Sequence, residues 1–222
     1  AIPWHGHTVV GTTDTPVAEP SLEPRPLAEE IDFILETTSG YLSERPGRTD
    51  ITSVFAGIRP LVKAGQAGTT AALSREHTIE ISKAGLVTMA GGKWTTYRRM
   101  AEDCVDHAAM LAGLDERPAA TRDLRIHGYH PSPPQFGAYA DYGEDAIALA
   151  GVVEGRPDLG EVLSQKAPIR AAQVFWAVRH EMAMTVDDVL ARRTRVLSID
   201  ARAAIDLAPA VARLMAAELG RD

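Results

Sequence analysis

The chain has 222 residues, of which 45% are hydrophobic and 24% charged, and its formal net charge is -7. This balance is typical of a globular protein and argues against non-specific nucleic-acid binding, which needs a basic face. No apolar run approaches the roughly 20 residues of a membrane-spanning helix, and the single cysteine, Cys104, cannot form an internal disulfide. The cytoplasm is therefore the expected compartment.

The first part of the chain indicates short strands and one helix. The run His7–Thr13 is rich in β-branched residues and predicts a strand, and a second strand is expected over Thr52–Ile58, closed by Pro60. Between them, apolar residues recur at helical spacing from Leu27 to Leu42, which predicts an amphipathic helix.

A β-hairpin and a second helix are predicted next. Thr78–Ser82 and Leu86–Met89 are the expected strands, and Lys83-Ala84-Gly85 reads as a three-residue loop with glycine in the left-handed position. The second strand leads through Ala90-Gly91-Gly92-Lys93 into a helix expected from about Thr96 to Leu111. One apolar stripe of this helix holds Tyr97, Met100, Ala101, Cys104, Val105, Ala108 and Leu111.

Beyond Leu114 the composition changes. A Pro-, Gly- and charge-rich linker is expected over 115–133, and 134–222 is predicted to be an all-α domain with helices near 136–153, 168–182, 185–193 and 200–219. Thr185 with Asp188 resembles a capping box, Asp200 is a candidate N-cap, and Pro209 is expected to break or kink the last helix. The sequence thus predicts an α+β fold, with a mixed part over 1–114 before the helical domain.

The turn Gly91-Gly92-Lys93 carries the clearest signal for a small-molecule site. Two glycines let the backbone approach a ligand closely, and the unpaired amides and positive dipole end of a helix favour an anion or a developing negative charge. Lys93 adds a cation at the same place. Such turns also join strands to helices without any ligand, with the lysine in solvent, so local chemistry leaves both interpretations open.

Two arginines are expected at comparable positions. Arg59 follows the predicted strand Thr52–Ile58, and Arg75 precedes the predicted hairpin. Open sheets place ligands where strands end, and the planar guanidinium suits phosphate or carboxylate. Together with Lys93, the arginines could hold a phosphorylated or carboxylated small molecule. The alternative is that Arg75 pairs with a carboxylate such as Glu76 and that Arg59 lies in solvent.

Other candidate residues favour structural roles. His5, His7 and His77 do not have the spacing of metal ligands, and no second cysteine supports zinc, so no metal site is expected. Phe175, Trp176 and Met182 lie on one stripe that we interpret as core or subunit contact, which leaves a homodimer open.

Several short motifs occur in a fixed order along the chain. They are Ile2-Pro3-Trp4, Gly11-Thr12-Thr13-Asp14, Gly57-Ile58-Arg59-Pro60-Leu61, Ser74-Arg75-Glu76-His77 and Gly91-Gly92-Lys93-Trp94-Thr95-Thr96-Tyr97-Arg98. In this order and at these intervals they resemble the FAD-dependent glycerol-3-phosphate dehydrogenases, within the wider group of glycine- and amino-acid-oxidase-like flavoproteins. The helical end is similar to that family's C-terminal region in Thr185–Arg195 and Ala208–Met215.

The resemblance implies a C-terminal portion: the end of the substrate-binding β-sheet region, the return to the FAD domain, and the helical domain. It implies that Arg59, Arg75 and Lys93 bind substrate and that Lys93 is also catalytic. It further implies that Gly91, Gly92, Lys93, Thr95 and Thr96 bind FAD in the complete enzyme. No Gly-x-Gly-x-x-Gly pyrophosphate loop occurs in the chain, so we expect the chain alone to be inactive and to lack bound FAD.

The implied reaction is oxidation of sn-glycerol 3-phosphate to dihydroxyacetone phosphate by hydride transfer to FAD. The implied acceptor is quinone, with the complete enzyme peripherally associated with the inner membrane. The same residues fit an oxidase that uses O2 as the acceptor. An alternative from another class is a non-catalytic helical interaction module, in which Arg59 and Lys93 have no role in turnover.

Overall fold

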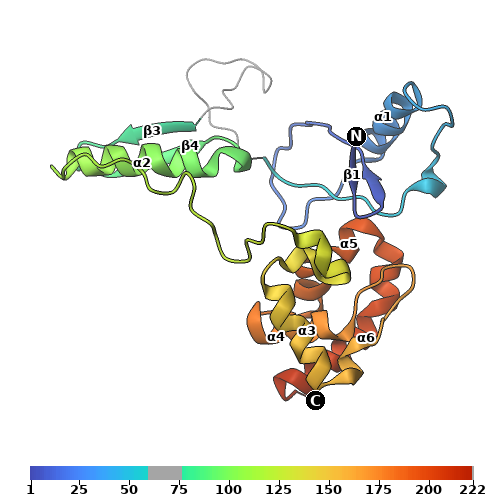
Figure 1. Ribbon diagram of the computed structural model, residues 1–222. Coiled ribbons are helices and arrows are strands. Elements are labelled where there is room, and N and C mark those ends of the chain that lie inside the picture. The colour runs from blue at the N-terminus through green and yellow to red at the C-terminus, as the bar shows by residue number, and fades with distance from the viewer. Residues whose placement is uncertain (60–76, 222) are drawn as a thin grey trace. The chain divides into compact units, whose positions relative to one another are not determined.

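The computed structural model describes residues 1–59 and 77–221 (Figure 1). This described part is mostly helical and contains two antiparallel sheets of two strands each. In one sheet β1 (Ile2–Trp4) pairs with β2 (His7–Val9), and in the other β3 (His77–Ile81) pairs with β4 (Val87–Gly91). The α+β fold class predicted from the sequence is confirmed.

Contacts between residues divide the chain into two units. The helical unit comprises Ala1–Thr15, Leu22–Ala56 and His127–Asp222, and the hairpin unit comprises Pro16–Ser21 and Gly57–Ile126. The contacts thus group two N-terminal segments with the C-terminal helices. The division predicted from the sequence instead separates 1–114 from 134–222 by a linker over 115–133. That division into domains stays a prediction.

The helical unit contains the buried core. Leu149, Val174 and Val211 are completely buried, and Trp176 is 6% exposed, so the aromatic stripe around Trp176 is partly core, as expected. Burial of such apolar surface is the main source of stability in a helical domain. The elements of this unit after the strands are α1 (Ala28–Ser39), a 3-10 turn (Arg48–Asp50), a 3-10 segment (Pro133–Tyr142), α3 (Asp145–Gly155), a 3-10 turn (Pro157–Gly160), α4 (Ala171–His180), a π-helical turn (Asp188–Arg193), α5 (Val196–Ile199) and α6 (Ala201–Leu219).

The predicted strand over Thr52–Ile58 is wrong. The start of this segment bonds to the region around α5: the Thr52 hydroxyl donates to the carbonyl of Ile199 at 2.6 Å, and the Ser53 hydroxyl donates to that of Leu197 at 2.7 Å. The Ala201 amide in turn donates to the Thr52 carbonyl at 3.0 Å. The polar groups of Thr52 and Ser53 are thus bonded to residues at the end of α5 and the start of α6. The β-branched residues of the segment do not belong to a sheet. The predicted strand over 7–13 is likewise shorter, because only His7–Val9 finds a partner.

Predicted helix ends are confirmed, whereas the predicted break is not. The Asp200 carboxylate accepts from the Ala203 amide at 2.9 Å, and Asp188 accepts from the Thr185 amide at 2.9 Å while its own amide donates to the Thr185 hydroxyl at 3.2 Å. Helix α6 runs through Pro209 without interruption. We attribute its continuity to core burial of neighbouring side chains, which outweighs the hydrogen bond that proline removes. These side chains are Ala204, Leu207, Val211 and Met215.

The hairpin unit is built from β3, β4 and α2 (Tyr97–Leu111), with α2 lying alongside the hairpin (Figure 1). The register pairs His77 with Gly91, Ile79 with Met89, and Ile81 with Val87. Gly85 has a φ of +83° in the predicted three-residue loop, and the Ser82 amide donates to the Leu86 carbonyl at 2.9 Å, so this loop is confirmed. Among the described residues of this unit none is buried.

Candidate site at the Gly91-Gly92-Lys93 turn

The turn between β4 and α2 requires glycine at two successive positions. Gly91 has a φ of +78° and Gly92 a φ of +80°, a backbone conformation that residues with a Cβ rarely adopt. Strand β4 ends at Gly91, and a 3-10 turn over Trp94–Thr96 starts the helix directly after Lys93. The glycines therefore reverse the chain from strand into helix within two residues.

A side chain at Gly92 would displace the end of Met100 and crowd His77. A Cβ at this position would be 2.5 Å from Sδ of Met100 on α2 and 3.2 Å from Cβ of His77 on β3. The side chains of Met100 on α2 and His77 on β3 thus occupy the space beside Gly92 that a Cβ would need. A close backbone approach of this kind is also what a planar ligand needs on the open side of the turn.

The start of the helix presents positive charge. Thr96 fixes the first turn, because its hydroxyl donates to the Lys93 carbonyl at 2.9 Å and its amide donates to the same oxygen at 3.0 Å. The amides of Trp94 and Thr95 lie at the helix start, where intrahelical partners do not exist. Lys93 is exposed, so a cation and the positive end of a helix occur together, as predicted.

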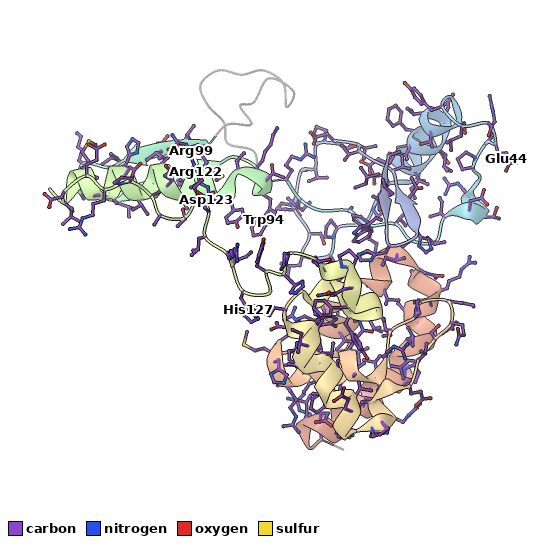
Figure 2. All side chains as sticks on the ribbon, viewed as in Figure 1. Glu44, Trp94, Arg99, Arg122, Asp123 and His127 are labelled. Atoms are coloured by element: carbon purple, nitrogen blue, oxygen red, sulfur yellow. The ribbon has the colours of Figure 1, made fainter. Side chains whose placement is uncertain are left out.

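An aromatic pair adjoins this start. Trp94 (Figure 2) is 87% exposed. Its ring stacks on that of Tyr97 with the ring centroids 5.6 Å apart. Such an exposed aromatic pair leaves apolar surface next to Lys93 for further protein or ligand to cover.

A cluster of polar side chains that was not predicted from the sequence links β3 to α2 beside the turn. Nε2 of His77 lies 2.8 Å from Oδ2 of Asp103, and Arg99 reaches Oδ1 of Asp103 at 3.1 Å. Nδ1 of His107 lies 2.7 Å from the Asp103 carbonyl. The only hint in the sequence is spacing, since Arg99, Asp103 and His107 follow each other at four-residue intervals on one helix face.

The two arginines differ from the turn residues. Arg59 is exposed and lies in an extended segment, and it does not follow a strand as predicted, because no strand forms over Thr52–Ile58. Arg75 lies outside the described residues. The structure therefore brings Gly91, Gly92, Lys93, Thr95 and Thr96 together in one turn, and the substrate role of the arginines stays a prediction.

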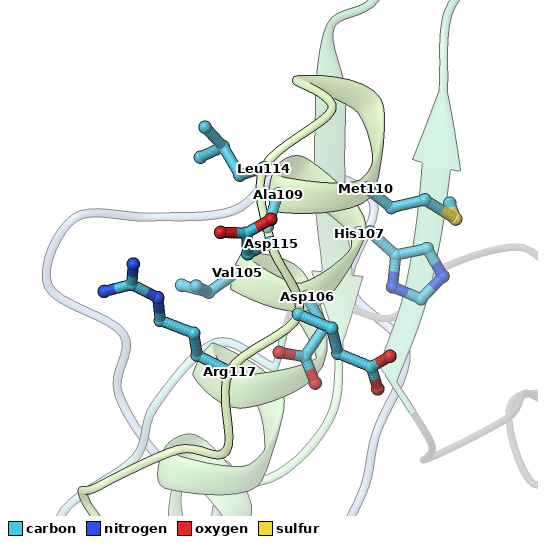
Figure 3. A pocket seen from close by; sticks show the side chains of 9 residues that line it. Val105, Asp106, His107, Ala109, Met110, Leu114, Asp115 and Arg117 are labelled. Carbon is cyan, nitrogen blue, oxygen red and sulfur yellow. The ribbon is translucent and has the colours of Figure 1, made fainter.

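A hollow of about 920 Å³ lies at the other end of α2 (Figure 3). It opens between the second half of the helix and the segment Leu114–Arg117, and it contains none of the predicted site residues. Its lining is Val105, Asp106, His107, Ala109, Met110, Leu114, Asp115, Glu116 and Arg117. In the described ranges, no group of three or more histidine, cysteine or acidic side chains is arranged to hold a metal ion.

The fold and the turn together define a helical domain preceded by a strand, a glycine turn and a helix. Residues 91–222, more than half of the chain, match the family model described as the C-terminal domain of alpha-glycerophosphate oxidase. The chain belongs to this family. The matched region begins at Gly91, so it includes the turn itself.

Solved and curated relatives agree with this assignment. The chain is 36% identical to glycerol-3-phosphate dehydrogenase, mitochondrial, of Mus musculus over 98% of its length, and 35% identical to the mitochondrial enzyme SDP6 of Arabidopsis thaliana over 98%. It covers 33% and 39% of those relatives. A structure of glycerol-3-phosphate dehydrogenase from Bacillus halodurans complexed with FAD superposes with a TM-score of 0.70 at 26% identity, covering 95% of this chain and 44% of that one. The resemblance read from the motifs is confirmed.

Proposed function

We propose that this chain is the C-terminal portion of an FAD-dependent enzyme that oxidises sn-glycerol 3-phosphate to dihydroxyacetone phosphate. The observation that carries the proposal is the turn itself: two glycines with positive φ, one against Met100 and His77, followed by an exposed lysine at a helix start. The relatives named above are dehydrogenases of this substrate by name, although the chain spans only about a third of the mouse protein.

The residues of the turn fit FAD. Gly91 and Gly92 give a backbone without side chains against which a flat ring can lie, and the helix start offers amides that donate to a ring carbonyl. Bound FAD would supply the acceptor for the hydride that leaves C2 of the substrate. Lys93 and the amides of Trp94 and Thr95 would stabilise the negative charge that develops at this edge of the site, where it is needed during the reaction.

Arg59 and Arg75 would bind the phosphate of the substrate. Their contribution is positioning, since binding energy from a phosphate remote from C2 can be used to orient the reacting carbon. We therefore expect substitution of Arg59 to act mainly on the KM for glycerol 3-phosphate, and substitution of Lys93 to act mainly on kcat.

The proposed electron acceptor is quinone, with the complete enzyme attached peripherally to the inner membrane from the cytoplasmic side, and a homodimer is compatible with this arrangement. The described residues include no helix with the length and apolar character needed to cross a bilayer. An oxidase is the second candidate, because the matching family model carries an oxidase in its description. Measuring quinol and peroxide formation by the complete enzyme separates the two acceptors.

The chain by itself is expected to be inactive and to bind FAD weakly or not at all. One wall of the proposed site is present, and no pyrophosphate-binding Gly-x-Gly-x-x-Gly loop occurs in the sequence. Titration of the purified chain with FAD, followed by fluorescence, tests this expectation. A stoichiometric flavin absorbance band in the purified chain would contradict it.

The central test compares two lysines of one hairpin unit in the complete enzyme. Lys93→Ala should lower kcat by on the order of 100-fold, the usual loss when one stabilising charge is removed from a developing anion. Lys83→Ala, in the exposed loop at the other end of the hairpin, is the matched control and should leave kcat unchanged. If Lys93→Ala and Arg59→Ala both leave kcat and the KM for glycerol 3-phosphate unchanged, the proposed function is wrong and the non-catalytic interaction module is favoured.

A further inference from the structure

We propose that His77 and Asp103 are positioning residues, which hold the Gly91-Gly92 turn in the conformation that places Lys93. The inference rests on the proposed function for its effect on turnover, but its structural part concerns this chain alone. Neither residue is part of the flavin or substrate contacts assigned above.

His77 adjoins both glycines of the turn. It is the first residue of β3 and pairs directly with Gly91, the last residue of β4. Its Cβ would lie 3.2 Å from a Cβ built on Gly92. Because His77 pairs with Gly91, a displacement of His77 would disturb the end of β4 that leads into Lys93.

Asp103, on α2, binds the side chain of His77. One carboxylate oxygen lies 2.8 Å from Nε2 of His77, and the other lies 3.1 Å from Arg99. The side chains of His77 and Asp103 are only 24% and 22% exposed, in a unit without fully buried described residues. Hydrogen bonds to a carboxylate that is partly shielded from water are stronger than those in open solvent.

These contacts close a ring through the fold. Strand pairing joins His77 to Gly91, the turn joins Gly91 to the helix start, and the Asp103 contact joins the helix back to His77. At the other end of the same hairpin the loop around Gly85 is closed by local hydrogen bonds between Ser82, Gly85 and Leu86, and a Cβ on Gly85 would meet nothing within 4 Å. The contact between His77 and Asp103, which links the strand to α2, lies at the end of the hairpin that carries Lys93.

The ring matters because Lys93 is exposed and its backbone precedes the first helical turn. Its charge can act on a developing anion only if the backbone of the turn stays fixed, and a misplacement of about 1 Å can cost a reaction on the order of 100-fold. We therefore expect loss of His77 or Asp103 to lower kcat while leaving the KM for glycerol 3-phosphate nearly unchanged.

The experiment in the complete enzyme uses His77→Ala, His77→Gln, Asp103→Ala and Lys93→Ala, with the double variant His77→Ala/Lys93→Ala. We expect His77→Ala to lower kcat roughly 10- to 100-fold, and His77→Gln to recover most of it, because the Gln amide can donate to Asp103. The double variant should be no slower than Lys93→Ala alone, since His77 acts through Lys93. Losses that multiply, or a loss confined to KM, would overturn the proposal.

A control separates positioning from mere stability. Val87→Ala removes apolar contact at the far end of the hairpin, opposite Ile81, and should lower stability without lowering kcat. If Val87→Ala and His77→Ala slow turnover equally, His77 is only structural.

The structural part is measured on this chain without flavin. Amide hydrogen exchange over residues 90–97 should accelerate at least 10-fold in His77→Ala and remain near the parent rate in His77→Gln and Val87→Ala. Faster exchange in His77→Ala together with unchanged turnover in Lys93→Ala would reject the proposed function but keep the positioning role of His77 in the fold. Unchanged exchange would reject the positioning role whatever the enzyme does.

Discussion

Substituting Gly92 by alanine tests the close approach on which the candidate site depends. Two separate costs are expected. The first is conformational, because a φ of +80° costs a residue with a Cβ about 1–2 kcal/mol. The second is steric and smaller: the new Cβ would lie 2.5 Å from Sδ and 2.7 Å from Cε of Met100, the flexible end of a side chain that can move aside, and 3.2 Å from Cβ of His77, which has to yield by a few tenths of an ångström. Gly92→Ala should therefore lower the local free energy of opening by more than the conformational cost of about 1–2 kcal/mol alone.

Gly85→Ala is the matched control within the same hairpin. Its φ of +83° gives the same conformational cost, but nothing lies within 4 Å of the added Cβ. The expected loss is therefore only about 1–2 kcal/mol. The difference between the two variants isolates the steric contact of Gly92 with Met100 and His77.

Hydrogen exchange of the peptides that cover β3, β4 and α2 is the suitable assay, because it reports opening of the hairpin unit without interference from the helical unit. A third variant, Gly92→Ala with Met100→Ala, removes the two closest atoms. Its loss should be smaller than the sum of the two single losses. Equal effects of Gly92→Ala and Gly85→Ala would refute the close approach, and with it the reason given for glycine at this position.

Three further predictions concern the helical unit. Leu149→Ala should lower its free energy of unfolding by about 2–5 kcal/mol in urea titrations, because Leu149 is completely buried; a loss below that of an exposed substitution such as Ile147→Ala would contradict the core. Asp200→Ala should cost about 1 kcal/mol through the lost cap, while Asp200→Asn should keep most of it, as thermal unfolding would show. Burial raises the pKa of Tyr142 to about 12, so the folded state keeps a proton that the unfolded state loses above pH 10. Stability should therefore fall between pH 10 and 12, by at most about 1.4 kcal/mol per pH unit, and Tyr142→Phe should flatten that decline.

The features that were predicted correctly from the sequence are those that depend on neighbouring residues. The loop ending in Gly85, the double-glycine turn and the Asp200 cap each depend on residues within a few positions of one another, and each has the expected form. In such cases the residue type itself restricts the backbone, through a positive φ or a side chain that can accept from a helix amide.

The predictions that failed, and the contacts that were not foreseen, depend on distant residues. Thr52 bonds to Ile199, 147 positions away, so composition alone could not distinguish its extended backbone from a strand. His77 and Asp103 meet across 26 positions, and the meeting exists only because the hairpin lies along α2. The same holds for Pro209, where burial in the core outweighs a local rule.

The apolar stripe of α2 depends both on local spacing and on contacts with distant residues. The stripe predicts a buried helix face, and Met100 and Cys104 are half-buried. The remainder is open, with Tyr97 53% exposed and Val105 64% exposed. A helix in water does not gain stability from apolar side chains that stay in solvent, and a contiguous exposed apolar face marks a surface that other protein covers. The stripe begins at Tyr97, the first residue of α2, close in sequence to Lys93. Under the proposed function we expect the FAD-binding part of the complete enzyme to cover this stripe.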